Sequence, residues 1–264
     1  MPRASVLALW RFFLVILVFI AFTPLYWILL KVNQSLGFRF GRFYLSMWRK
    51  CIGHQLIIKG ELSKIKPTLF VSNHSSYVDI LILGTFVPAR FVAKQEVAKW
   101  PIMGWLATRQ GTIYIDRNRN AIAEGTDKLL EYLNKGENLI LFPEGTTSDG
   151  CRVLPFGSSF FDIAMKNNVV VQPITVTYAG WNGLPMPRIL RKMCGWFSPD
   201  VDLLSHLWRI AQWGTVQVIV ELHPLFKPTA FASRKELAQA SFQVVQEGLI
   251  GAFAQPLCEQ KSSV

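Results

Sequence analysis

The chain has 264 residues, of which 51% are hydrophobic and 17% are charged, and its formal net charge at pH 7 is +11. This length allows one large domain or two small ones with a proper hydrophobic core. The charge is uneven, because residues 1–60 hold eight Lys or Arg and no acidic residue. The sequence has no G-K-[ST] loop, zinc finger or basic recognition helix, so composition argues against a nucleic-acid partner and points to a lipid surface.

The first part of the chain contains a run of 19 uncharged residues, Phe12–Leu30. A stretch of this length is just sufficient to cross the hydrocarbon core of a bilayer. We expect residues 1–35 to form a retained membrane-anchoring helix, because a cleaved signal peptide has a shorter apolar region and a small-residue cleavage site. The alternative is a hairpin that is broken near Pro24 and enters one leaflet.

The next segment, residues 36–50, mixes basic and aromatic side chains. This pattern is typical of a segment that lies on anionic lipid with its rings at headgroup level, although a solvated basic face is an alternative. Two basic residues precede the apolar run, and five follow it by Lys50. The positive-inside rule therefore predicts that everything after Lys31 is cytoplasmic, which in a bacterium places the catalytic part on the inner face of the inner membrane.

The four cysteines are widely spaced and predict no disulfide framework: Cys51, Cys151, Cys194 and Cys258. In a cytoplasmic body we expect reduced structural thiols. Cys51-x-x-His54 is half of a zinc pattern, but no second pair has matching spacing, so we expect no metal.

Residues 36–264 are expected to form one α/β domain with a mixed, largely parallel sheet flanked by helices. Short runs rich in Val and Ile alternate with helical patterns, which is typical of a sheet covered on both faces. The predicted strands are Gln55–Lys59, Thr68–Val71, Arg90–Ala93, Thr112–Ile115, Asn138–Phe142, Val169–Thr177 and Val216–Glu221. The predicted helices are Val78–Gly84, Asn120–Asn134, Ser159–Asn167, Leu203–Gln212 and Lys235–Leu249. We expect a long irregular excursion between Trp181 and Pro199.

The most informative motif places a histidine five residues before a carboxylate, in Asn73-His74-Ser75-Ser76-Tyr77-Val78-Asp79. The flanking apolar runs predict a strand that ends near Ser72 and a helix that begins near Ser76. On one continuous helix the two side chains would diverge by roughly 140°, so they can meet only if His74 precedes the helix. A carboxylate on one ring nitrogen leaves the other free to accept a proton.

The same segment also fits a capping box. Ser76 would be the N-cap, Asp79 would reach back to it, and His74 would be an ordinary turn histidine.

Two further motifs follow predicted strands. Gly111–Arg117 ends in Asp116-Arg117, and Arg117 can offer a bidentate fork to a phosphate, although a plain surface arginine is the alternative. Phe142-Pro143-Glu144-Gly145-Thr146 is a turn in which Gly145 permits close approach or an unusual backbone conformation. Glu144 would repel a phosphate and is better suited to orient an arginine or accept a hydrogen bond; an ordinary turn capped by Thr146 is the alternative.

Together with Val171-Gln172-Pro173-Ile174, these motifs resemble the four ordered blocks of the glycerolipid acyltransferases, and most of all the bacterial 1-acyl-sn-glycerol-3-phosphate acyltransferases. The resemblance covers roughly residues 45–225. One departure is that no arginine follows the threonines of the third block, where some members carry one. This departure bears on acceptor specificity rather than on the chemistry.

The resemblance implies a mechanism. His74 would take a proton from the acceptor hydroxyl, which attacks an acyl thioester directly, while Asp79 orients the ring. Arg117 and the turn made by Phe142, Pro143, Glu144, Gly145 and Thr146 would hold the acceptor phosphate. The donor would be acyl-CoA or an acyl-acyl carrier protein, with no metal or other cofactor, and the product would be phosphatidic acid.

Two other functions compete with this one. The first is the same chemistry on lyso-ornithine lipid or another lysolipid, whose lack of a phosphate would leave Arg117 without its expected ligand. The second is a non-catalytic protein of the membrane surface, in which His74 would have no role. The absence of a G-x-S-x-G motif argues against a serine acyl-enzyme in either case.

Overall fold

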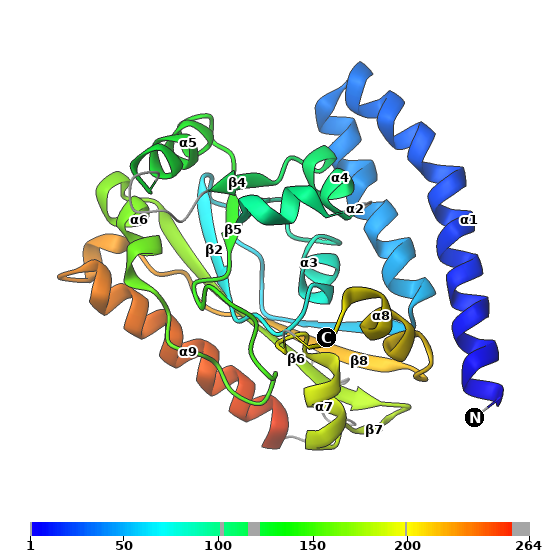
Figure 1. Ribbon diagram of the computed structural model, residues 1–264. Coiled ribbons are helices and arrows are strands. Elements are labelled where there is room, and N and C mark those ends of the chain that lie inside the picture. The colour runs from blue at the N-terminus through cyan, green and yellow to red at the C-terminus, as the bar shows by residue number, and fades with distance from the viewer. Residues whose placement is uncertain (1, 101–102, 116–121, 199, 255–264) are drawn as a thin grey trace.

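A central sheet organises the computed structural model, which describes residues 2–100, 103–115, 122–198 and 200–254 (Figure 1). Within these residues the sheet has eight strands, in the order β1-β8-β6-β2-β5-β3-β4, with β7 paired to β6. Only the β6–β8 and β6–β7 pairings are antiparallel; all the other described pairs are parallel. The expected mixed, largely parallel α/β sheet is therefore confirmed. The strands are β1 (His54–Lys59), β2 (Thr68–Ser72), β3 (Arg90–Lys94), β4 (Ile113–Ile115), β5 (Leu139–Leu141), β6 (Val170–Trp181), β7 (Leu184–Pro185) and β8 (Val216–Leu222).

Helices cover both faces of this sheet (Figure 1). The α-helices are α1 (Pro2–Val32), α2 (Gln34–Cys51), α3 (Val78–Leu83), α4 (Met103–Arg109), α5 (Ile122–Asn134), α6 (Asp162–Asn167), α7 (Arg188–Cys194), α8 (Leu203–Ala211) and α9 (Arg234–Ala254). Three short 3₁₀ helices are η1 (Gln95–Lys99), η2 (Ser158–Phe161) and η3 (Pro228–Ala230).

Strand β2 lies between two hydrophobic cores. Leu69 and Val71 point to the core shared with α5, α6 and α9, whereas Phe70 points to the core shared with α3 and α8. Alternate side chains of a strand face opposite sides of the sheet, so a strand that is buried on both faces reads as a continuous apolar run. This double burial fixes the position of the polar turn that follows Ser72.

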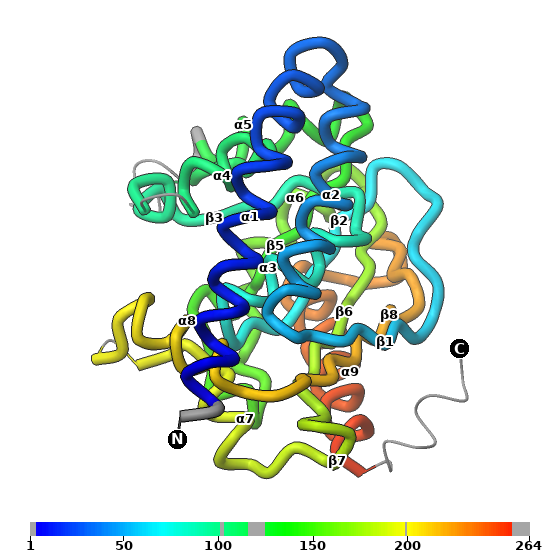
Figure 2. Tube along the Cα trace, turned by 90° about the vertical axis from the view of Figure 1, so that its right-hand side faces the viewer, coloured from blue at the N-terminus to red at the C-terminus, as the bar shows by residue number. Residues whose placement is uncertain are grey.

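Helices α1 and α2 form a hairpin beside the body (Figure 2). Two glycines of α2 permit the close contact: a Cβ at Gly37 would lie 2.8 Å from the Cα of Leu30, and one at Gly41 would lie 3.2 Å from the Tyr26 ring. Small residues four apart allow helix backbones to approach in this way. Helix α1 also contacts the body of the protein near its start. There Arg11 donates hydrogen bonds to the carbonyl oxygens of Ala211, the last residue of α8, and of Trp213 and Gly214.

Helix α1 continues through Pro24 to Val32, as a single anchoring helix requires, and the break of the alternative hairpin is absent. Residues 36–50 belong to α2, and their predicted contact with anionic lipid stays a prediction. In this helix Tyr44 is buried and several rings pack against α1. The reason is the helical period, which turns Phe40, Tyr44 and Trp48 to one side, where they meet Phe19 and Tyr26 of α1.

The predicted strands are all present, with shifted ends, but the excursion after Trp181 is more regular than expected. It contains β7 and α7, and β6 runs four residues past the predicted end at Thr177. Strand β6 is extended because it pairs with β8 as far as Trp181, through an irregularity near Tyr178.

Candidate active site

His74 and Asp79 meet at the carboxyl end of β2. The Nδ1 atom of His74 lies 2.9 Å from Oδ2 of Asp79. The contact forms because His74 lies in the turn before α3, whereas Asp79 lies in the first turn of that helix. The imidazole is partly accessible, with 16% of the side chain exposed, while the carboxylate is fully buried. With Nδ1 occupied, Nε2 is the ring nitrogen left to exchange a proton with a ligand.

Asp79 also caps the turn. Its Oδ2 atom accepts hydrogen bonds from the backbone N–H groups of Ser75 at 2.7 Å and Ser76 at 2.9 Å. The same oxygen therefore makes the backbone contact of the capping interpretation and the ring contact that the catalytic one requires, although the N-cap of α3 is Tyr77 rather than Ser76. A carboxylate that is held by backbone donors cannot swing away, so it fixes the orientation of the ring.

The other carboxylate oxygen has a partner that the sequence did not suggest. The Tyr178 hydroxyl donates a hydrogen bond to Oδ1 of Asp79 at 2.7 Å. Tyr178 lies on β6 and is buried; its pKa is raised well above the ordinary value, first by burial and then by the charge of Asp79. The phenol therefore stays protonated and acts as a permanent donor to Asp79.

Glu144 ties the third motif to the first. Its Oε1 atom accepts from the backbone N–H of His74 at 2.8 Å, and its Oε2 atom accepts from that of Leu154 at 3.2 Å. Burial raises the pKa of Glu144 to about 8, against the two N–H donors, which lower it. Glu144 thus positions the turn that carries His74, and its described hydrogen-bond donors are backbone N–H groups rather than the arginine or the hydroxyl that the sequence suggested.

The rest of this turn shapes the surroundings of the imidazole. The Phe142 ring stacks on the His74 ring, with the centroids 3.9 Å apart. Gly145 has a φ of 72°, as its place in the motif suggested, and its N–H donates to the carbonyl of Phe142. Pro143 is buried, whereas Thr146 is exposed.

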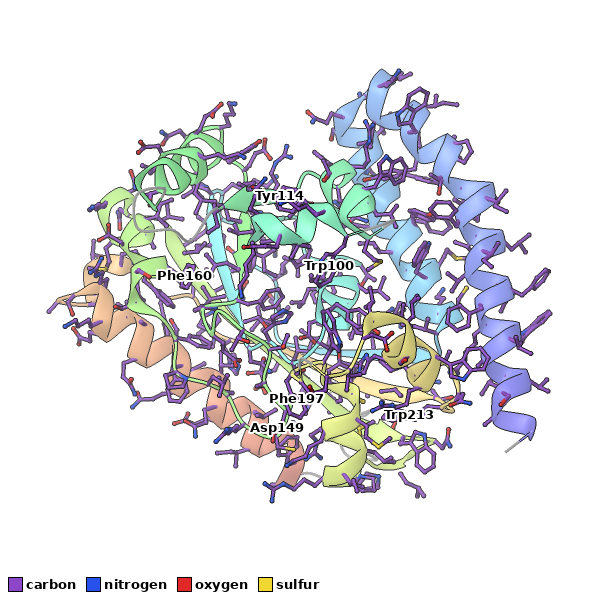
Figure 3. The ribbon with its side chains drawn as sticks, viewed as in Figure 1. Trp100, Tyr114, Asp149, Phe160, Phe197 and Trp213 are labelled. Atoms are coloured by element: carbon purple, nitrogen blue, oxygen red, sulfur yellow. The ribbon has the colours of Figure 1, made fainter. Side chains whose placement is uncertain are left out.

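A cavity of about 380 Å³ opens beside His74 and Thr146. Its wall is mostly apolar and comes from η1, α4, β3, β4, η2 and the segment after α7. Trp100, Phe160 and Phe197 contribute from three separate segments around it (Figure 3). The site can therefore place a hydrocarbon chain next to the partly exposed imidazole of His74.

Arg117 of the second motif and the whole fourth motif are not seen in the described wall of the cavity. Arg117 lies outside the described residues, two positions along the chain from Ile115, which lines the cavity. The fourth motif lies inside β6, where Pro173 pairs with Val71 and the Gln172 side chain bonds to the backbone of residues 61, 63 and 223. That motif aligns the strands beside the site and does not line the cavity. No group of three or more His, Cys, Asp or Glu in the described segments could hold a metal ion.

Several known proteins are similar to this chain. A family model described as Acyltransferase matches residues 55–177. The lyso-ornithine lipid O-acyltransferase of Brucella abortus is 34% identical over 242 residues, which cover 87% of this chain and 90% of that protein. The chain belongs to the acyltransferase family. The resemblance found in the four motifs is thereby confirmed, and so is the O-acyltransferase activity.

Other relatives of this acyltransferase carry two different names. The lyso-ornithine lipid O-acyltransferase of Pseudomonas aeruginosa is 34% identical over 82% of this chain and 80% of its own length. The 1-acyl-sn-glycerol-3-phosphate acyltransferase of Neisseria meningitidis is 32% identical over 58% of each chain. The crystal structure of the 1-acyl-sn-glycerophosphate acyltransferase PlsC from Thermotoga maritima matches with a TM-score of 0.71 and 23% identity, over 96% of this chain and 98% of that one. This likeness shows the fold.

A second buried pair supports the catalytic turn of the acyltransferase. The Tyr77 hydroxyl lies 2.9 Å from Nδ1 of His206 on α8, and Nε2 of His206 faces the carbonyl oxygens of Met193 and Gly195 at 3.1 Å. This contact holds the segment after α7 against the turn, and Trp196 of that segment lines the cavity. The Trp196 ring packs between Tyr77 and Trp100.

Proposed function

We propose that this acyltransferase moves an acyl chain from a thioester donor to the free hydroxyl of a membrane lysolipid, with His74 as general base. The observation that carries the proposal is the His74–Asp79 pair, whose remaining ring nitrogen adjoins an apolar cavity. The family membership supplies the reaction class, and the cavity supplies room for a hydrocarbon chain.

Nε2 of His74 takes the proton of the acceptor hydroxyl as its oxygen attacks the thioester carbonyl carbon. The tetrahedral adduct then expels the sulfur, which takes the proton from the imidazolium, so the products are an ester and a free thiol. Asp79 stabilises the transient imidazolium, and Tyr178 and the two backbone N–H groups keep its carboxylate in place. A positioned base of this kind contributes roughly 10²- to 10⁴-fold in rate.

No metal or further cofactor takes part in these steps, and the donor is acyl-CoA or an acyl-acyl carrier protein. The stacked Phe142 ring and the buried carboxylate keep the imidazole in one orientation, which a direct attack requires. Orienting reacting groups in this way can account for a large share of a rate enhancement.

Two acceptors fit this chemistry. The sn-2 hydroxyl of 1-acyl-glycerol-3-phosphate is supported by the four motifs and by the names of the Neisseria relative and the Thermotoga structure. Lyso-ornithine lipid is supported by a likeness that extends over far more of the chain, 87% against 58%. Arg117 suits either acceptor, because a guanidinium fork pairs with a phosphate or with the carboxylate of an amino acid.

The experiment is an assay of the purified protein with a labelled acyl thioester against both lysolipids at matched concentrations. The lysolipid that is acylated with the larger kcat/KM is the preferred acceptor. Transfer to neither lysolipid by a folded, lipid-bound protein would contradict the proposal.

Helix α1 supports a membrane location for the enzyme, because it is long and apolar enough to cross a membrane. Its exposed side chains recur every three or four residues and form one apolar stripe: Val6, Leu9, Phe13, Ile16, Leu17 and Ile20 are each more than half exposed. The other side of the helix is bound to the protein through Arg11 and through Phe12, which stacks on Trp208. We infer that α1 enters one leaflet of the bacterial inner membrane from the cytoplasmic face.

Reporter fusions at both ends of the chain test this topology. A helix in one leaflet leaves both ends in the cytoplasm, whereas a crossing helix puts the N-terminus in the periplasm. A periplasmic signal from the N-terminal fusion would contradict the one-leaflet arrangement, and one from a fusion after Val264 would contradict the cytoplasmic location.

A further inference from the structure

A second cavity, of about 480 Å³, lies between helix α2 and the body of the protein. One face of α2 lines it: Gln34, Phe38 and Arg42 are spaced four residues apart, and Arg39 follows Phe38. The opposite wall comes from the turn before β3, the end of α4 and the turn before β5. Gln110 is the residue contributed by the end of α4.

The cavity holds an excess of positive charge. Its cations are Arg39, Arg42, Lys66 and Arg90, and its one carboxylate is Glu137. Glu137 is already engaged, because both of its oxygens accept hydrogen bonds from Arg90. No described carboxylate therefore pairs with the two arginines of α2.

These two arginines carry an electrostatic cost. Arg42 is half-buried, and its pKa is lowered first by burial and then by the nearby charge of Arg39. Like charges that are brought together at partly buried positions are unfavourable unless an anion joins them. A phosphate group can accept hydrogen bonds from two guanidinium forks at once.

The cavity is separate from the catalytic one. Strands β2, β5 and β3 run parallel, and His74 and Phe142 follow the carboxyl ends of β2 and β5. The α2 cavity is lined instead by Arg90 and Asn138, at the amino ends of β3 and β5. The two cavities share the Phe91 side chain of β3 but lie toward opposite ends of these strands, so the acceptor site does not account for the charge of this one.

The apolar residues near the cavity indicate where its ligand comes from. Val32 and Leu36, at the turn between α1 and α2, are 77% and 45% exposed. They continue the apolar surface of α1, which we place in the membrane. A cationic cavity beside such a surface lies at the depth of lipid headgroups.

We propose that Arg39 and Arg42 form a non-catalytic binding site for the phosphate of an anionic phospholipid headgroup. The lipid joins the α1–α2 hairpin to the body and neutralises the two arginines. This site goes beyond the acyl-transfer reaction, because its ligand is neither consumed nor formed there.

The test is native mass spectrometry of the full chain in mild detergent with phosphatidylglycerol. We expect one phosphatidylglycerol to be retained in the wild type, and Arg39→Gln/Arg42→Gln to lower retention by about tenfold or more, since charge-assisted hydrogen bonds to two forks are lost. The matched control, Lys50→Gln/Lys64→Gln, removes the same charge from two exposed residues outside the cavity and should retain the lipid. Arg42→Lys should lose part of the retention, because an ammonium cannot reproduce the fork.

Three results would overturn the proposal. An equal loss of phosphatidylglycerol retention in both double variants would show diffuse attraction of the basic protein to anionic lipid. Displacement of the lipid by millimolar glycerol phosphate or inorganic phosphate would show a site for a soluble ion. Loss in Arg117→Ala would assign the retained lipid to the acceptor site. Thermal unfolding checks the fold of each variant, and Arg39→Gln alone, at an exposed position, provides the readout if the double variant unfolds. Lipid retention is measured without turnover, so a failed acyl-transfer assay would leave this result standing.

Discussion

The turn that carries His74 and the helix α1 depart from the usual distribution of polar and apolar residues in opposite directions. In the turn, a carboxylate is fully buried and surrounded by donors. Along α1, side chains such as Val6 and Ile20 are 64% and 65% exposed. A buried charge is costly unless it is paired, and an exposed apolar stripe is costly in water. We propose a function for each exception: catalysis for the buried carboxylate, and contact with lipid for the exposed stripe.

The strongest test of the catalytic side is the loss of the imidazole. His74→Ala should lower kcat for acyl transfer by roughly 10²-fold or more, because no other described side chain occupies the position of the base. Binding to vesicles should persist, since α1 is untouched. Normal turnover in this variant would contradict the assignment of His74 as the general base.

The next largest effect should separate catalysis from capping. Asp79→Asn keeps the shape but cannot stabilise the imidazolium, so we expect a loss of about 10²-fold in kcat. Asp202→Asn is the matched control, because Asp202 caps α8 through a hydrogen bond from Ser205 N–H and has no catalytic partner. Asparagine caps helices about as well as aspartate, so the control should keep its activity. Similar small effects of the two substitutions on kcat would show that Asp79 acts only as a cap.

A smaller effect is expected at Arg117, which is predicted to clamp the charged group of the acceptor lipid. Arg117→Ala should raise the acceptor KM by about tenfold or more and leave the thioester KM nearly unchanged, because charge-assisted forks are strong hydrogen bonds. Arg117→Lys should recover part of this loss. The measurement is steady-state kinetics with both substrates varied. Equal effects on an anionic and an uncharged acceptor would rule out the clamp.

Tyr178→Phe should have a milder effect on the same reaction. The variant lacks one hydrogen bond to Asp79, so the carboxylate is held less rigidly. The lost hydrogen bond is worth about 0.5–1.5 kcal/mol, which corresponds to a several-fold loss in kcat. If Tyr178 acts by positioning Asp79, the pH profile of kcat should also shift. Reduced stability with an unchanged kcat and pH profile would show a purely structural role.

The smallest effect concerns pH and the buried His54. Burial lowers its pKa from 6.5 to about 4 in the folded state. Between these values the unfolded chain binds a proton that the folded chain does not, so the free energy of unfolding should fall as the pH is lowered from 6.5 toward 4. The slope from one such group is at most about 1.4 kcal/mol per pH unit. His54→Leu should show a shallower slope in denaturant unfolding at pH 7 and pH 5, and an unchanged slope would contradict the assignment.

The sequence was sufficient for the local features of the site. His74 and Asp79 are five residues apart, so their contact depends only on a strand end and a helix start, which apolar runs predict well. The turn at Glu144 and Gly145 was found for the same reason. The partner of Glu144 was not, because the backbone N–H of His74 carries no sequence signal.

Long-range contacts could not be predicted. Tyr178 is 99 residues from Asp79, and a tyrosine in an apolar strand looks like any core residue. The same holds for His206, which meets Tyr77 only after the segment beyond α7 folds back. The packing of the α2 rings on α1 could not be predicted either, because an aromatic residue suits a membrane surface and a helix interface equally well.

The most direct measurement of the central claim follows the thiol and the ester together. The purified enzyme is mixed with a labelled acyl thioester, with and without lysolipid, and free thiol and lipid ester are counted from the first turnover. Direct attack activated by His74 predicts one thiol released for each ester formed, no burst of thiol without acceptor, and neither product from His74→Ala. A burst of thiol equal to the enzyme concentration in the absence of lysolipid would show an acyl-enzyme and contradict the mechanism.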